Sequence, residues 1–146
     1  MRRFFGWVVR AVLPFAAVFS LTGCINDGAS YHADNGRQIL SIVRENNFFW
    51  EKQVGLSVVV ARMPECQRRH FLQKSAPKAH IELWQPGENT FVLRLGKRMY
   101  VAENRTCEGF SALDEEPPGG LGAHLGTFGE SDGVFVFVPA EPAAER

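Results

Sequence analysis

Residues 81–101, IELWQPGENTFVLRLGKRMYV, carry three short strand patterns separated by two turns. Ile81, Leu83 and Gln85 alternate with Glu82 and Trp84, and in 91–95 the apolar residues Phe91, Leu93 and Leu95 recur at every second position. Turn-forming residues lie between these runs, at 85–89 (QPGEN) and at 96–97 (GK). Alternation of this kind with short turns is typical of consecutive antiparallel strands, so we predict a meander of hairpins.

Strand patterns continue on both sides of this segment. Residues 54–61 are rich in valine, residues 68–74 alternate loosely, and residues 134–138 (VFVFV) are apolar on both faces, as in a central strand. Residues 38–44 fit a strand or a helix, and we favour a strand. Six or seven short strands with at most one short helix predict a mainly β fold, a small antiparallel barrel or sandwich.

Polar segments set the limits of the predicted domain. Residues 25–37 are rich in Asn, Asp, Gly and Ser without periodicity, so we predict a tether at 24–37 before a single β-rich domain at 38–138. Residues 111–133 include an acidic run and many glycines, and we expect them to form a long loop. The Ala-, Glu- and Pro-containing residues 139–146 are expected to form a flexible tail.

Three adjacent aromatic residues, Phe48-Phe49-Trp50, follow the polar pair Asn46-Asn47. Burial of such side chains removes a large apolar area from water, so we expect the cluster to pack in the core or to cover it. An exposed platform for a ligand is the alternative.

The first 23 residues have the organisation of an export signal. Met1-Arg2-Arg3 is positively charged, and residues 11–21 form an apolar run. A helix of that length rises only about 16 Å, whereas the hydrocarbon core of a bilayer is about 30 Å thick. Extending the run back to Phe4 would include Arg10 and Pro14. We therefore predict a signal peptide rather than a membrane-spanning helix.

The sequence Leu21-Thr22-Gly23-Cys24 resembles the lipobox of bacterial lipoproteins, and the resemblance covers residues 1–24 only. It implies that residues 1–23 are removed and that Cys24 carries acyl chains such as palmitate, which anchor the chain in a membrane of the cell envelope. An ordinary secretory signal with a chance cysteine is the alternative. In the lipoprotein class an aspartate after the cysteine implies retention at the inner membrane, so Ile25 favours the outer membrane.

Assignment of Cys24 to lipid leaves Cys66 and Cys107, which we predict to form a disulfide in an oxidising compartment. A tetrahedral zinc set that adds His70 and His80 is the alternative. The spacing of these four residues matches no compact zinc motif, so we expect no metal site and no cofactor.

Charge gives a second candidate site. After removal of residues 1–23, with their three arginines, the chain has 13 Lys and Arg against 16 Asp and Glu, which predicts no nucleic-acid partner. Residues 66–99 have a local net charge of +5 and residues 103–132 one of −6. Basic residues on a shared sheet face would bind an envelope protein, cell-wall carboxylates or the phosphates of lipid A. The candidates are Arg68, Arg69, Arg94, Lys97 and Arg98. The alternative is that the acidic segment folds over the basic strands.

Motifs of catalysis are absent from the sequence: it has no Gly-x-Ser-x-Gly, phosphate-binding loop or His-Glu-x-x-His. We therefore predict a non-catalytic binding or assembly module and no enzyme. The architecture is similar to that of small lipoprotein inhibitors of lysozyme, so inhibition of a host hydrolase is one alternative, although the paired Gly-Tyr and Trp-Ser segments of those inhibitors are missing. A small periplasmic enzyme that uses His70 or His80 is the other.

Overall fold

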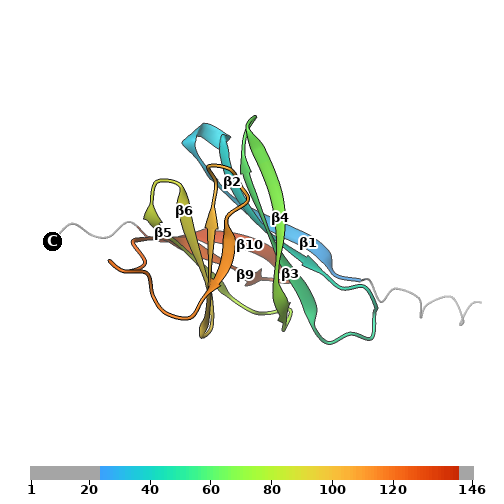
Figure 1. Cartoon of the computed structure of the whole chain (residues 1–146). Helices are drawn as coiled ribbons and strands as arrows, with labels where there is room; N and C mark the ends of the chain where they lie inside the picture. The colour runs from blue at the N-terminus through green and yellow to red at the C-terminus, as the bar shows by residue number, and fades with distance from the viewer. Residues whose placement is uncertain (1–23, 142–146) are drawn as a thin grey trace, which may run out of the picture.

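The computed structural model describes residues 24–141, which form ten β-strands in two antiparallel sheets (Figure 1). The first sheet contains β1 (Asn26–Ala33), β2 (Gln38–Glu45), β3 (Val54–Arg62) and β4 (Cys66–Ser75) in that order. The second contains, in spatial order, β10 (Val134–Pro139), β9 (Ala123–Ser131), β5 (Ile81–Gly87), β6 (Thr90–Leu95), β7 (Arg98–Glu103) and β8 (Phe110–Leu113). A single 3-10 turn, η1 (Asp34–Gly36), joins β1 to β2.

The mainly β prediction is confirmed, and of the two predicted architectures the protein adopts the sandwich, because the two sheets share no strand. The meander predicted within residues 81–101 corresponds to β5, β6 and β7, and residues 38–44 belong to strand β2. The described strands number ten, whereas six or seven were expected. Residues 24–141 contain no helix that is long and apolar enough to cross a membrane.

The inward faces of the two sheets form one apolar core. In the first sheet, Leu40 lies opposite Val60 and Ile42 opposite Val58, and all four side chains are buried. The second sheet contributes the residues predicted from alternation, together with phenylalanines of β9 and β10: Ile81, Leu83, Phe91, Leu93, Phe128 and Phe135. Burial of these side chains is the main stabilising contribution that a sandwich of this size has available.

Arg44 occupies the last inward-facing position of β2 and links the two sheets. Its guanidinium donates to both carboxylate oxygens of Asp27 (2.7 and 2.6 Å) and to Glu130 (3.1 Å). It also donates to the carbonyl of Pro77 and lies 4.4 Å from the ring centroid of Phe135. The hydrogen bond with Asp27 raises the pKa of Arg44, so this buried side chain stays charged and paired.

The prediction of a tether at residues 24–37 is wrong. Residues 26–33 form β1, which pairs with β2 along its whole length, from Asn26 opposite Glu45 to Ala33 opposite Gln38. Without β1, the backbone groups on that side of β2 would form an exposed sheet edge. Tyr31 also packs on the ring of Phe137 in β10, with a centroid distance of 5.3 Å. The domain therefore begins two residues after Cys24.

The prediction of a long loop at 111–133 is also wrong. Strand β8 extends to Leu113 and β9 begins at Ala123, so the connection comprises only residues 114–122. The predicted tail begins later than residue 139: Pro139 still belongs to β10, and the amide of Ala140 donates to the carbonyl of Leu125. The predicted signal peptide (1–23) and residues 142–146 of the predicted tail lie outside the described residues.

Candidate functional site

The strand register gives the sandwich two distinct ends. The start of β1 and the connections after β2, β4 and β6 lie at one end, which we call the anchor end because it contains Cys24. The connections after β1, β3, β5 and β7 lie at the other, the disulfide end. The anchor ends of the two sheets lie together, because Arg44 at the end of β2 contacts Glu130 near the end of β9.

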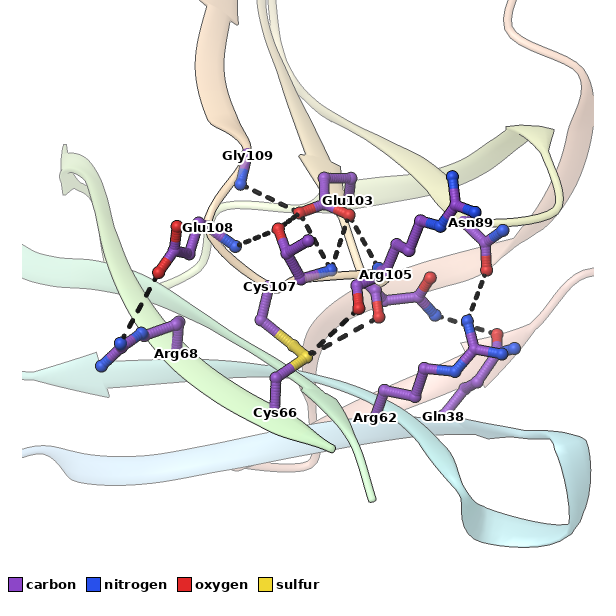
Figure 2. Close-up of a disulfide and its surroundings, with 12 residues drawn as sticks. Gln38, Arg62, Cys66, Arg68, Asn89, Glu103, Arg105, Cys107, Glu108 and Gly109 are labelled. Carbon is purple, nitrogen blue, oxygen red and sulfur yellow. Dashed lines mark hydrogen bonds and ion pairs between the residues drawn. A yellow bond between two sulfur atoms is a disulfide. The ribbon is translucent and has the colours of Figure 1, made fainter. Parts of the chain in front are cut away.

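The predicted disulfide is confirmed and ties the two sheets together (Figure 2). Cys66 opens β4 in the first sheet, Cys107 lies between β7 and β8 of the second, and the Cα atoms are 5.9 Å apart. Both sulfur atoms are used in this bond, so neither is a thiolate ligand for zinc. The part of the chain that the structure describes holds no group of three or more His, Cys, Asp or Glu side chains that would fit a metal ion.

Glu103 organises the connection that carries Cys107 (Figure 2). Its carboxylate accepts hydrogen bonds from the backbone amides of Arg105 (2.7 Å), Thr106 (3.0 Å) and Gly109 (3.1 Å), and from the hydroxyl of Thr106. Desolvation alone would raise the pKa of Glu103, but these hydrogen bonds stabilise the anion and lower the pKa to about 2. The connection is therefore closed around a carboxylate that is ionised at neutral pH.

Asn104 joins neighbouring connections of the disulfide end. Its buried side chain donates to Gln38 Oε1 (3.0 Å), and its backbone amide donates to the carbonyl of Asn89 (3.0 Å). Arg62 donates to the side chain of Asn89 (2.8 Å), as Figure 2 shows. Connections from both sheets are thus cross-linked by hydrogen bonds as well as by the disulfide.

The five predicted basic residues do not share a sheet face. Arg68 and Arg69 are neighbours on β4 and therefore project to opposite sides of the first sheet. Arg94 lies on the outward face of the second sheet, and Lys97 and Arg98 lie in and after the turn that follows β6, at the anchor end. The shared-face condition of the sequence-based prediction is wrong, because the topology separates these strands between two sheets.

Three of these arginines pair with carboxylates of the same chain. Arg68 lies 3.7 Å from Glu108. Among the described residues, this is the only ion pair between the acidic segment 103–132 and the basic segment 66–99. Arg69 lies 2.7 Å from Glu45, and this contact lowers the pKa of the Glu45 carboxyl. Arg94 donates to Glu82 (2.7 Å). Arg98 instead donates to the side chain of Gln73.

The two histidines considered for catalysis lie at opposite ends. His70 Nε2 donates to the carbonyl of Cys107 (2.8 Å), and its ring stacks on Phe110. These contacts assign His70 a packing role beside the disulfide. His80 is exposed at the edge of a hollow of about 520 Å³, in which the carboxylate of Glu82 is already paired with Arg94.

The aromatic cluster lies at the surface, contrary to the prediction from sequence. Phe48, Phe49 and Trp50 are 49%, 63% and 64% exposed, so the expectation that they join or cover the core is wrong. They lie in the connection 46–53 between β2 and β3, at the anchor end. Polar residues on both sides, Asn46-Asn47 and Glu51-Lys52-Gln53, are the sequence signal that favours an exposed loop.

Cys24 is exposed and carries the one thiol outside the disulfide among residues 24–141. The next residue, Ile25, is fixed to the protein, because its carbonyl accepts a 2.8 Å hydrogen bond from the amide of Asn46. Cys24 therefore lies beside the start of the aromatic loop.

Comparisons with models of protein families, with curated proteins and with solved structures found no match. A function can be proposed from the N-terminal sequence motif and from the two ends of the sandwich.

Proposed function

We propose that this chain is a lipoprotein of the bacterial cell envelope that is held to a membrane by lipid on Cys24 and acts as a non-catalytic binding or assembly module. The observation that supports the proposal is the position of Cys24 at the end of the sandwich opposite the cross-linked connections. An anchor at Cys24 directs the disulfide end away from the membrane. That end is then the face available to a partner.

The disulfide end has the properties of a preorganised binding surface. The disulfide, the Glu103 hydrogen bonds and the Asn104 contacts hold its connections in place before a partner arrives. Binding to such a surface costs less conformational entropy than binding to mobile loops. Exposed side chains there include Met63, which is 46% exposed, Arg68 and Glu108. We propose an envelope protein as the partner.

The short distance between anchor and domain restricts the reach of the module. Strand β1 begins at Asn26, so the sandwich starts directly after the lipidated residue instead of at the end of a tether. A partner must therefore approach to within the height of one sandwich above the membrane. Ile25 in place of an aspartate supports delivery to the outer membrane.

Site-specific photo-crosslinking in living cells tests this function. A photoreactive residue is introduced at Met63, at the disulfide end, or at Val138, a matched exposed position (56%) on the edge strand β10. We expect one envelope protein to be captured from position 63 and not from position 138. Capture should be lost in a Cys24→Ala version. Equal capture from both positions would contradict the assigned face, as would capture that does not depend on Cys24.

A further inference from the structure

The loop 46–53 presents an apolar surface that the rest of residues 24–141 leaves uncovered. Phe48 stacks on Trp50 with a centroid distance of 4.8 Å, and Phe49 meets Trp50 edge-on at the same distance. The three rings pack on each other while about half or more of each side chain remains exposed. Soluble surfaces rarely leave large apolar side chains grouped in this way without a binding function.

Polar contacts hold the loop in one conformation. The side chain of Asn46 accepts a hydrogen bond from the amide of Phe48 (2.9 Å) and donates to the carbonyl of Glu51 (3.0 Å). The amide of Glu51 also donates to the carbonyl of Phe48 (3.0 Å). Lys74 on β4 pairs with the Glu51 carboxylate (3.0 Å). The polar groups thus face the protein and one another, and the aromatic rings face outward.

The loop and the lipid site occupy one place in the fold. The amide of Asn46 donates to the carbonyl of Ile25, the residue after Cys24. Phe48, Phe49 and Trp50 follow Asn46 closely in the chain, so the aromatic loop begins beside Cys24. Figure 1 shows the connection between β2 and β3 extending beside the start of β1. A membrane that holds acyl chains on Cys24 is therefore the surface nearest to these rings.

We propose that Phe48, Phe49 and Trp50 insert into the interfacial region of the phospholipid membrane that anchors Cys24. This inference rests on the proposed lipid anchor and adds a second, protein-borne contact with the same membrane. Aromatic side chains favour the boundary between headgroups and acyl chains, where their rings are apolar and the indole N–H still meets water. Contact at both the lipid and the loop fixes the tilt of the sandwich.

A polar groove of about 240 Å³ behind the loop suits the headgroup layer. Its lining includes Arg69, which pairs with Glu45, and Lys74, which pairs with Glu51. The ring of Phe71, which is 60% exposed, also lines it. Lys74 adjoins the loop through its ion pair with Glu51, so charged side chains border the aromatic rings. Charged side chains beside an exposed aromatic cluster are the arrangement expected of an interfacial contact.

Tryptophan fluorescence tests the inference, since Trp50 and Trp84 are the only tryptophans in residues 24–146. The lipidated chain is purified from cells and reconstituted into phosphatidylethanolamine and phosphatidylglycerol vesicles, with or without bromine on the acyl chains. A Trp84→Phe variant reports on Trp50, and a Trp50→Phe variant reports on Trp84, which lies on β5 in the second sheet. Vesicle flotation and mass spectrometry report separately on the lipid anchor.

We expect a blue shift and a loss of Trp50 emission in brominated vesicles, larger for bromine near the headgroups than for bromine deep in the chains, with Trp84 emission unchanged. If the chain floats with vesicles while Trp50 keeps its emission, the inference is wrong and the lipid anchor still holds. If Trp50 emission changes only when envelope proteins are added, the inference is likewise wrong. Quenching of Trp84 as well overturns the assigned orientation. A chain that does not float overturns the lipid anchor and this inference together.

Discussion

The backbone amide of Asn46 donates a 2.8 Å hydrogen bond to the carbonyl of Ile25. This contact extends the pairing of β1 with β2 by one step and joins the residue after Cys24 to the first residue of the aromatic loop. It removes the freedom that a tether would have provided between Cys24 and the domain. Under the proposed lipid anchor, the position of Cys24 therefore determines which end of the sandwich faces the membrane.

Asn46→Ala should loosen the aromatic loop. The substitution removes the side-chain hydrogen bonds to Phe48 and Glu51, each with a net value of about 1 kcal/mol, so we expect a loss of about 1 to 2 kcal/mol in the free energy of unfolding. Urea denaturation gives the loss, and hydrogen exchange should show faster exchange at Glu51. Asn47→Ala is the control because Asn47 is exposed and should change little. Equal effects of the two substitutions would contradict the role of Asn46.

Arg44→Met should destabilise the sandwich by about 3 kcal/mol, because it leaves Asp27 and Glu130 without their common partner. Arg37→Met is the matched control: Arg37 also pairs with a carboxylate, that of Asp34, but its side chain is 68% exposed, and the loss should stay below about 1 kcal/mol. Chemical denaturation of both variants measures the difference. Similar losses would show that burial does not strengthen the Arg44 contacts.

Glu103→Gln should lower stability at neutral pH and have little effect in acid. The pKa of Glu103 falls from its ordinary value of 4.5 to about 2 on folding, so its stabilising effect is complete above pH 4.5 and is lost as the pH falls towards 2. We expect a deficit of about 1 to 2 kcal/mol at neutral pH, measured by urea denaturation across this range. Glu108→Gln is the matched control, because this side chain is 72% exposed and its replacement should change stability little. A deficit that persists near pH 2 would argue against the charge as its origin.

Replacement of both Cys66 and Cys107 by alanine should cost up to about 4 kcal/mol, since the bridge closes a loop with a sequence separation of 41. Denaturation with and without reductant checks the value: reductant should destabilise the parent chain and leave the double variant unchanged. A parent chain that is insensitive to reductant would contradict a stabilising role for the bridge.

Strands with strict alternation and clear turns were predictable from sequence. In β6, Phe91, Leu93 and Leu95 face the core as the period of two requires, and the turn before Arg98 lies where Gly96-Lys97 placed it. The Cys66–Cys107 pairing followed from the cysteine count once Cys24 was assigned to lipid. These features depend on local patterns or on elimination, which a single sequence contains.

Strands β1, β8 and β9 were missed, and the interactions that stabilise β1 and β9 involve residues elsewhere in the chain. β1 (NDGASYHA) has little apolar content of its own and is held by backbone pairing with β2. In β9, a side chain at Gly126 would come within 2.4 Å of the Val138 carbonyl, and one at Gly129 within 2.5 Å of the His80 ring. These glycines read as loop residues in sequence, but they are required by neighbouring strands and side chains.

The candidate site was predictable only in parts. The disulfide was identified by residue type, and the lipid site at Cys24 stays a prediction. The grouping of the basic residues required knowledge of which sheet holds each strand: Arg68, Arg69, Arg94, Lys97 and Arg98. The exposure of Phe48, Phe49 and Trp50 likewise depends on where the connection between β2 and β3 projects. A hydrophobic cluster in a loop has the same composition whether it covers the core or faces a membrane.

The lipid anchor is the central claim, and mass spectrometry of the N-terminal peptide of the chain purified from membranes tests it most directly. We predict a peptide that begins at Cys24 and carries acyl chains on its thiol, with residues 1–23 absent, and no such peptide from a Cys24→Ala version. A free thiol on Cys24, or a chain that retains residues 1–23, would contradict the anchor and with it the assigned orientation of the sandwich.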